Sequence, residues 1–206
     1  MEEILSLYAK PYDPQRPVVC MDETSKQLVG NTREAIALQP GQPRRFDTEY
    51  ERKGVANLFL AFEPLASKRV VVVTERRTTV DWAYFIKHLL DHYYAEVEQV
   101  VLVMDNLNTH HKASLYAAFP AHEAKRLADK LEIHYTPKHG SWLNMAEIEF
   151  SILSRQCLER RIDSRASLEH EVKAWEYRRN AQQVEMDWRF KVEDARTKLK
   201  RLYPSY

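Results

Sequence analysis

The chain has 206 residues, of which 44% are hydrophobic and 30% charged, and its 31 basic residues balance its 30 acidic ones to a net charge of +1. This composition suits a folded α/β domain, excludes a mini-protein, and argues against a disordered chain or a polycation. The sequence contains no apolar run long enough to cross a membrane, no secretory leader and no Gly-rich phosphate loop, so we expect a cytoplasmic protein with no membrane partner and no nucleotide cofactor. Cys20 and Cys157 stand in no metal-binding or redox spacing, so we expect both thiols to be reduced and packed.

The first half of the chain predicts three strands followed by a helix. Residues 1–9 favour the last turns of a helix, and prolines at positions 11, 14 and 17 then favour an extended connector. The first strand is predicted to be short, Val18–Met21, and to end at Asp22 with a polar stretch after it. The sequence then predicts an antiparallel pair of strands at Val55–Phe62 and Arg69–Thr74 and a threonine-capped helix over about Thr79–Tyr94.

The second half alternates strand and helix. Val100–Met104 is the strongest buried-strand signal in the chain, and it ends on Asp105. The sequence next predicts a helix within Ala121–Leu131, a strand at Ile133–Thr136, the loop Pro137–Gly140, a long helix from about Asn144, and two helices from about Arg165 broken near Met186–Phe190. This order predicts a mixed five-stranded sheet flanked by helices, which fits a ribonuclease-H-like α/β fold. We expect residues 1–17 to be a helix and Pro-rich linker, 18–164 the main domain and 165–206 a C-terminal helical extension.

Two aspartates, Asp22 and Asp105, each follow an apolar strand directly. If those strands are neighbours, two carboxylates come together, and the repulsion between them favours a bound cation. Oxygen ligands without a nearby cysteine favour Mg²⁺ or Mn²⁺ over zinc. A third acid is expected from the helix after Asn144, where Glu147 and Glu149 flank the buried stripe at similar angles, so helix geometry leaves both candidates open.

Three blocks of the sequence resemble a known family. They are MDET around Asp22, VMDNLNTHH around Asp105 and TPKHGSWLNMAEIEF around Glu147. They look like the three catalytic blocks of bacterial insertion-sequence transposases of the Tc/mariner superfamily, which are Asp-Asp-Glu enzymes on a ribonuclease-H-like fold. The second block matches the family's Asp-Asn pair with a His five residues after the Asp. The third matches its Leu-Asn-x-x-Glu pattern with an aromatic residue three positions further on, and this register selects Glu147 over Glu149.

The resemblance implies the chemistry of the site. Asp22, Asp105 and Glu147 would be the catalytic residues and would hold two ions, Mg²⁺ or Mn²⁺, in one centre for DNA strand cleavage and strand joining. The implied partners are double-stranded DNA, as transposon ends and as target, and a second copy of the chain in the DNA complex. The remaining candidates could orient the reacting phosphate or contact DNA, and they are Asn106, His110, Lys138, His139 and Asn144.

Two features depart from the family pattern. Asp105 and Glu147 enclose 41 residues, more than in the eukaryotic branch, and the extra length falls around Ala118–Lys130. Family members also carry N-terminal helix-turn-helix domains, whereas nine residues precede the Pro-rich connector here, so we expect the catalytic half alone. Two other interpretations stay open: a metal-dependent nuclease of the same fold that joins no strands, and an inert DNA-binding remnant.

Overall fold

The computed structural model describes residues 1–33, 40–41, 48–107, 110–138 and 140–203, and its strands form one mixed sheet in the order β3-β2-β1-β4-β5. The strands are β1 (Val18–Gly30), β2 (Glu51–Glu63), β3 (Lys68–Thr74), β4 (Val100–Met104) and β5 (Leu131–Tyr135). The first three pair antiparallel, whereas β4 runs parallel to both β1 and β5. The prediction of a mixed five-stranded sheet is therefore confirmed.

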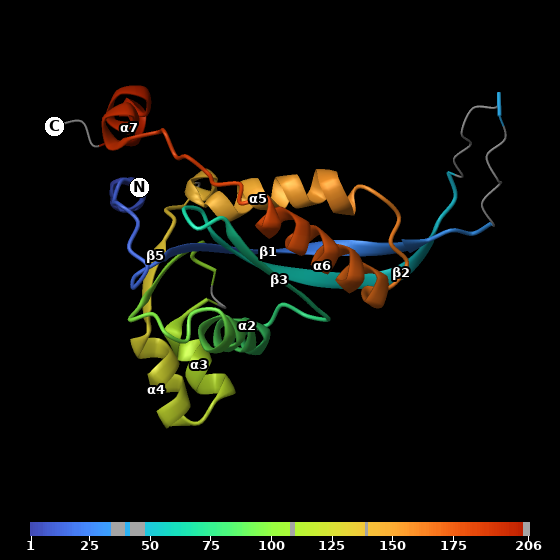
Figure 1. Ribbon diagram of the computed structural model, residues 1–206, viewed down its shortest axis with the longest axis horizontal. Helices are drawn as coiled ribbons and strands as arrows, with labels where there is room; N and C mark the ends of the chain where they lie inside the picture. The colour runs from blue at the N-terminus through green and yellow to red at the C-terminus, as the bar shows by residue number, and fades with distance from the viewer. Residues whose placement is uncertain (34–39, 42–47, 108–109, 139, 204–206) are drawn as a thin grey trace.

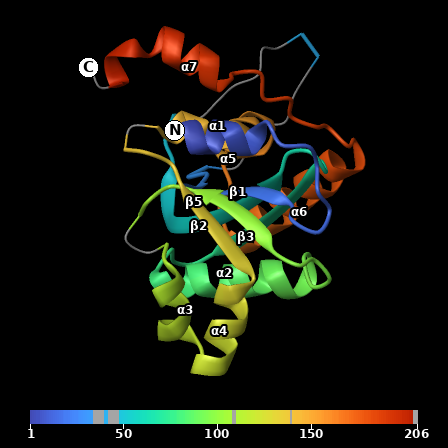
Figure 2. The same cartoon turned by 90° about the vertical axis from the view of Figure 1, so that its left-hand side faces the viewer.

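Helices cover both faces of this sheet (Figure 1). One face carries α2 (Thr79–His92), α3 (Lys112–Ala118) and α4 (Ala121–Asp129), and the other carries α5 (Met145–Leu153), its π-helical continuation η2 (Ser154–Leu158) and α6 (Arg165–Ala181). Helix α1 (Glu2–Tyr8) lies on the α5 side (Figure 2), where α7 (Val192–Lys198) packs against it through an Arg196–Glu2 ion pair of 2.7 Å. The short turns η1 (Ser141–Leu143) and η3 (Lys200–Leu202) complete the described elements. None of the described helices is both long enough and apolar enough to cross a membrane.

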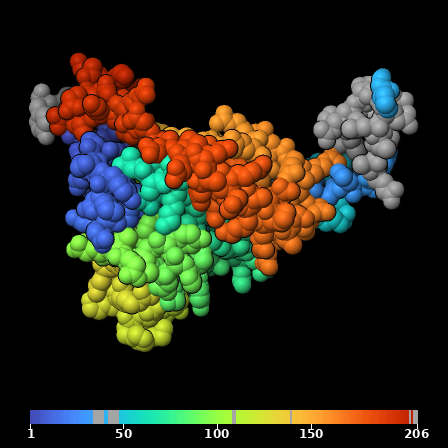
Figure 3. Space-filling model, in the orientation of Figure 1, coloured from blue at the N-terminus to red at the C-terminus, as the bar shows by residue number. Residues whose placement is uncertain are grey.

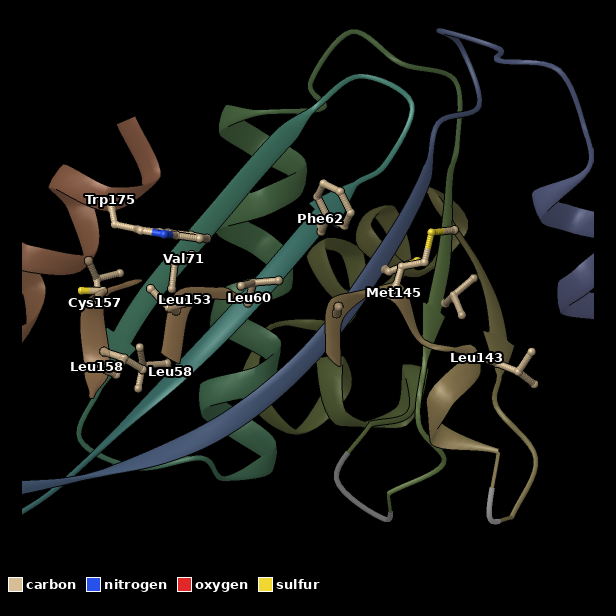
Figure 4. Packing of buried hydrophobic residues seen from close by; sticks show 14 of the residues in the cluster. Leu58, Leu60, Phe62, Val71, Leu143, Met145, Leu153, Cys157, Leu158 and Trp175 are labelled. Atoms are coloured by element: carbon tan, nitrogen blue, oxygen red, sulfur yellow. The ribbon is translucent and has the colours of Figure 1, made fainter. Parts of the chain in front are cut away.

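The core consists of two apolar layers, one on each face of the sheet. Because successive strand residues point to opposite faces, Cys20 and Leu60 pack under α5 and α6, while Met21 and Phe59 pack under α2. Figure 4 shows the first layer, in which strand side chains meet those of α5, η2 and Trp175 of α6. Residues of α1 and α7 belong to the same layer. The division at residues 17 and 164 stays a prediction.

The first strand is longer than the sequence predicts. It continues past Asp22 to Gly30, because β2 pairs with it along that whole length and satisfies its backbone groups on one side. The two strands leave the body as a two-stranded extension (Figures 1 and 3), and the first five residues of β2 are exposed there. A register shift beside Leu28 places Gly54 at φ +106°, a bulge conformation that favours glycine.

The remaining elements follow the predicted order with two corrections. Helix α2 begins as expected, with a capping box between Thr78 and Asp81, but it ends at His92. The sequence did not predict α3, a helix of 7 residues that is too short to show a periodic pattern. Strand β4 has the predicted bounds, and the two C-terminal helices are separated by the segment predicted to break them.

Candidate active site

Asp22 lies where β1 and β4 separate, rather than at a strand end. The parallel pairing of the two strands covers only Val18–Cys20 against Val101–Val103. Strand β4 ends at Met104 and Asp105 follows it, whereas β1 continues beyond that point paired with β2. The opening between the strands therefore exposes an edge of β1 at Asp22. The predicted approach of Asp22 and Asp105 therefore depends on the end of β4 alone, because β1 continues past Asp22.

The charges of four carboxylates meet at this opening. Burial raises the pKa of Asp22 to about 7, and the negative charges of Asp105, Glu23 and Glu147 add to that rise. A hydrogen bond of 2.8 Å from the Glu23 amide to Asp22 Oδ1 opposes it by favouring the ionised form. Burial and these acidic neighbours together disfavour the ionised form of Asp22, which a bound cation would stabilise.

Glu147 stands in the first turn of α5, and Asn144 fixes where that helix begins. The Asn144 side chain accepts a hydrogen bond from the Ala146 amide (3.2 Å) as the helix cap, and its Nδ2 donates to the carbonyl of Met21 (2.8 Å). Met21 immediately precedes Asp22, so one buried side chain ties the start of α5 to β1 beside the carboxylate. Asn144 is 1% exposed and thus acts as a structural cap, whereas Glu147 is half-buried.

Glu149 has a different environment, which the sequence left open. Its carboxylate is fully buried and accepts hydrogen bonds of 2.9 Å from Arg69 Nε of β3 and from Arg179 Nε of α6. Arg69 is 1% exposed and also lies over the ring of Phe62, 4.5 Å from its centroid. Glu149 is therefore the centre of a structural ion network between helices and sheet, and Glu147 is the acid of this helix that faces the Asp22 opening.

The structure adds a residue that sequence reasoning missed, Glu23. Its Oε2 lies 3.1 Å from Nε2 of His110, whose Nδ1 lies 3.0 Å from Oδ1 of Asp105. Burial would lower the pKa of His110, but the two carboxylates raise it to about 9, so the imidazole is a cation at neutral pH. The sequence offered Glu23 only as the neighbour of Asp22 in MDET. Because neighbouring strand residues face opposite sides of a sheet, that position did not indicate a place in the same site.

Candidate metal ligands come closest together in this same group. Among the described residues, Glu23, Asp105 and His110 are the set of three whose ligand atoms all lie within 4.8 Å of one another. Asp22, Asp105 and Glu147 do not meet that limit together. Each ring nitrogen of His110 faces a carboxylate oxygen, at 3.0 Å for Asp105 and 3.1 Å for Glu23, so in this arrangement His110 supplies positive charge to the cluster.

The other predicted residues fall into two groups. Asn106, directly after Asp105, and Lys138, in the loop before α5, are both exposed and can meet a large ligand. His110 is buried at 1% exposure, so its contacts are internal. His139 lies outside the described residues.

The family model for the DDE superfamily endonuclease matches residues 17–169. No curated protein matches the chain.

Solved transposase complexes share the fold. The structure described as "Mos1 transposase paired-end complex with left transposon end" has a TM-score of 0.60 at 17% identity, covering 89% of this chain and 55% of that one. The "Mos1 mariner paired end complex with Mn" has a TM-score of 0.58 at 17% identity with the same coverage, and "a pre-cleavage Mos1 transpososome" has 0.56 at 16%, covering 91% and 61%. The predicted ribonuclease-H-like fold is confirmed, and this chain spans 55–61% of the length of those transposases. With the family model matching most of its length, the chain belongs to the DDE superfamily of endonucleases.

Proposed function

We propose that the chain is the catalytic domain of a DNA transposase, which cleaves DNA strands and joins a DNA 3′ end to a target by cut-and-paste transposition. The observation that carries this proposal is the meeting of three carboxylate charges from separate parts of the chain, at an opening in the sheet beside the capped start of α5. Membership of the endonuclease family supports it. We assign Asp22, Asp105 and Glu147 as the catalytic triad.

The residues present fit a divalent-metal centre. The pKa of Asp22 is raised mainly by burial and further by the charges of Asp105, Glu23 and Glu147, so a bound cation would stabilise the ionised carboxylate. The donor atoms on offer are carboxylate oxygens, which suit Mg²⁺ or Mn²⁺, and one solved relative of the same fold is a complex with Mn. We assign one ion to Asp22 and Asp105, and a second to Glu147 with one of the two aspartates. Bound ions would supply activation of the attacking hydroxyl and neutralisation of charge on the reacting phosphodiester.

The chain's own side chains then have distinct tasks. The three carboxylates fix the site of reaction, and the cap made by Asn144 keeps Glu147 at a set distance from β1. Asn106, directly after Asp105, and Lys138, in the loop before α5, are exposed, and we assign them to contacts with DNA phosphates, which provide most of the non-specific affinity of DNA-binding proteins.

The partners and location are part of the same proposal. The solved relatives are described as transposon-end complexes and a transpososome, which supports double-stranded transposon ends as substrates for this chain. We propose target DNA with a TA dinucleotide as the second substrate. Joining two ends together requires two catalytic sites, so we propose a homodimer in the DNA complex. We propose a bacterial cytoplasmic location, at the nucleoid when DNA is bound.

One experiment tests the activity and separates it from the alternatives. Purified chain is incubated with Mn²⁺, supercoiled plasmid and a labelled duplex that ends in a 3′-hydroxyl, and products are resolved on gels. Nicked plasmid together with labelled joined product supports the proposal, and Asp105→Ala should abolish both. Nicking without joined product would indicate a nuclease only. The absence of any metal-dependent product, or unchanged cleavage by Asp105→Ala, would overturn the assignment.

A further inference from the structure

The imidazole of His110 bridges two carboxylates that come from different strand regions. Its Nδ1 is 3.0 Å from Asp105 Oδ1, and its Nε2 is 3.1 Å from Glu23 Oε2. The side chains of His110 and Glu23 are 2% and 4% exposed, while that of Asp105 is 32% exposed. Asp105 is thus the member of this group that reaches the open side of the site.

Glu23 approaches the group from the opposite face of the sheet to Asp22. Strand alternation places Glu23 on the side of Met21, in the layer under α2, and Asp22 on the side of Cys20, in the layer under α5. Glu23 therefore contacts Asp105 through the His110 ring, from behind the strands.

Packing fixes the orientation of that ring. The buried indole of Trp82 from α2 stacks on it, with ring centroids 5.9 Å apart and planes at 26°. The His110 backbone is held as well, because its carbonyl accepts a hydrogen bond of 2.8 Å from the Tyr135 hydroxyl and its amide donates to the Leu107 carbonyl at 3.0 Å. A ring held on its face, on both edges and through its backbone can define the position of the carboxylate it contacts.

We propose that Glu23 and His110 are positioning residues for Asp105: Glu23 anchors one edge of the imidazole, and the other edge holds Asp105 Oδ1 so that the second oxygen is presented to a divalent cation. This inference rests on the proposed function, in which Asp105 is a metal ligand. It assigns a task to Glu23, and it makes His110 a partner of a ligand, with no contact of its own to DNA. Removing such a partner typically lowers metal affinity or activity by about 10–100-fold.

The test is direct binding of Mn²⁺, measured by titration calorimetry on the purified chain without DNA. Glu23→Leu and His110→Gln remove the bridge, and Glu23→Gln keeps an oxygen that can accept from Nε2. Glu63→Gln is the matched control, because Glu63 is another glutamate with a buried carboxylate, in β2, that accepts a hydrogen bond from the Tyr94 hydroxyl at 2.8 Å. Thermal unfolding of each variant establishes that it is folded.

We expect Glu23→Leu and His110→Gln to raise the Mn²⁺ dissociation constant by about 10–100-fold, Glu23→Gln to raise it less, and the control to leave it unchanged. Dissociation constants equal to wild type in the folded variants would overturn the inference, as would the loss of a whole Mn²⁺ equivalent in Glu23→Leu, which would make Glu23 a ligand. If Glu23→Leu does not fold, His110→Gln and Glu23→Gln decide the matter. A wild-type chain that binds no Mn²⁺ would instead refute the proposed metal centre itself.

Discussion

The substitution Glu149→Gln, paired with Glu147→Gln, separates the structural acid of α5 from the proposed catalytic one. The Glu149 carboxylate is fully buried and carries the only negative charge within 4 Å of Arg69, among the described residues. Its neutralisation leaves Arg69 as a buried cation without a counter-ion, which costs about 3–5 kcal/mol. For a chain of this size, each kcal/mol lowers the melting temperature by about 2–4 °C, so we expect a fall of roughly 6–20 °C.

Glu147→Gln should behave in the opposite way. Glu147 is half-buried and has no ion-pair partner among the described residues, so its substitution should change stability by less than about 0.5 kcal/mol. It should abolish Mn²⁺-dependent cleavage. Differential scanning calorimetry in EDTA gives the melting temperatures, and titration calorimetry gives Mn²⁺ binding. If Glu149→Gln melted with the wild type and lost Mn²⁺ binding, the roles of the two glutamates would have to be exchanged.

Two further predictions concern the same opening. In EDTA, Asp22→Asn should be more stable than wild type, and its advantage should grow as pH rises. The pKa of Asp22 is about 7 in the folded chain, above its ordinary value. The wild-type protein therefore loses folding stability as pH rises from about 4 through 7, whereas the asparagine variant does not. At pH 8 the unfolding free energies of the variant and the wild type should differ by at most roughly 4 kcal/mol. Urea unfolding at pH 5 and pH 8 measures this difference, and an equal difference at both pH values would contradict the prediction. Asn144→Ala should lower the unfolding free energy by about 2 kcal/mol, because the Met21 carbonyl and the helix cap both lose a partner. Asn144→Ser keeps the cap and loses only the Met21 contact, so it should lose less, whereas an equal loss would show that the helix cap contributes nothing.

The charge of the site also explains why its residues are buried to different degrees. His110 brings one positive charge into the group that it forms with Glu23 and Asp105. That charge offsets part of the repulsion, so the strands can close around Glu23 without a cation on that face. Asp22 faces the other side, where burial and the charges of nearby acids both disfavour its ionised form.

Local signals in the sequence were sufficient for much of this molecule. The apolar run of β4 and the capping box of α2 predict those elements because their causes, burial on both faces and a satisfied helix start, involve neighbouring residues. The order of strands and helices predicted the mixed sheet, and the resemblance of three short blocks to a known family pointed to Asp22, Asp105 and Glu147, an assignment that stays a proposal. Each of these inferences depends on residues within one element or one block.

Tertiary contacts decided the rest. The polar half of β1 becomes a strand only because β2 pairs with it along its whole length. Glu149 is excluded as an open ligand by Arg69, which is 80 residues away in sequence. Glu23 meets Asp105 only through a histidine that β4 and the following turn bring behind the sheet. Sequence patterns report how a residue suits its own helix or strand, whereas the partner that neutralises or positions a buried charge comes from another element, and only the folded chain brings the two together.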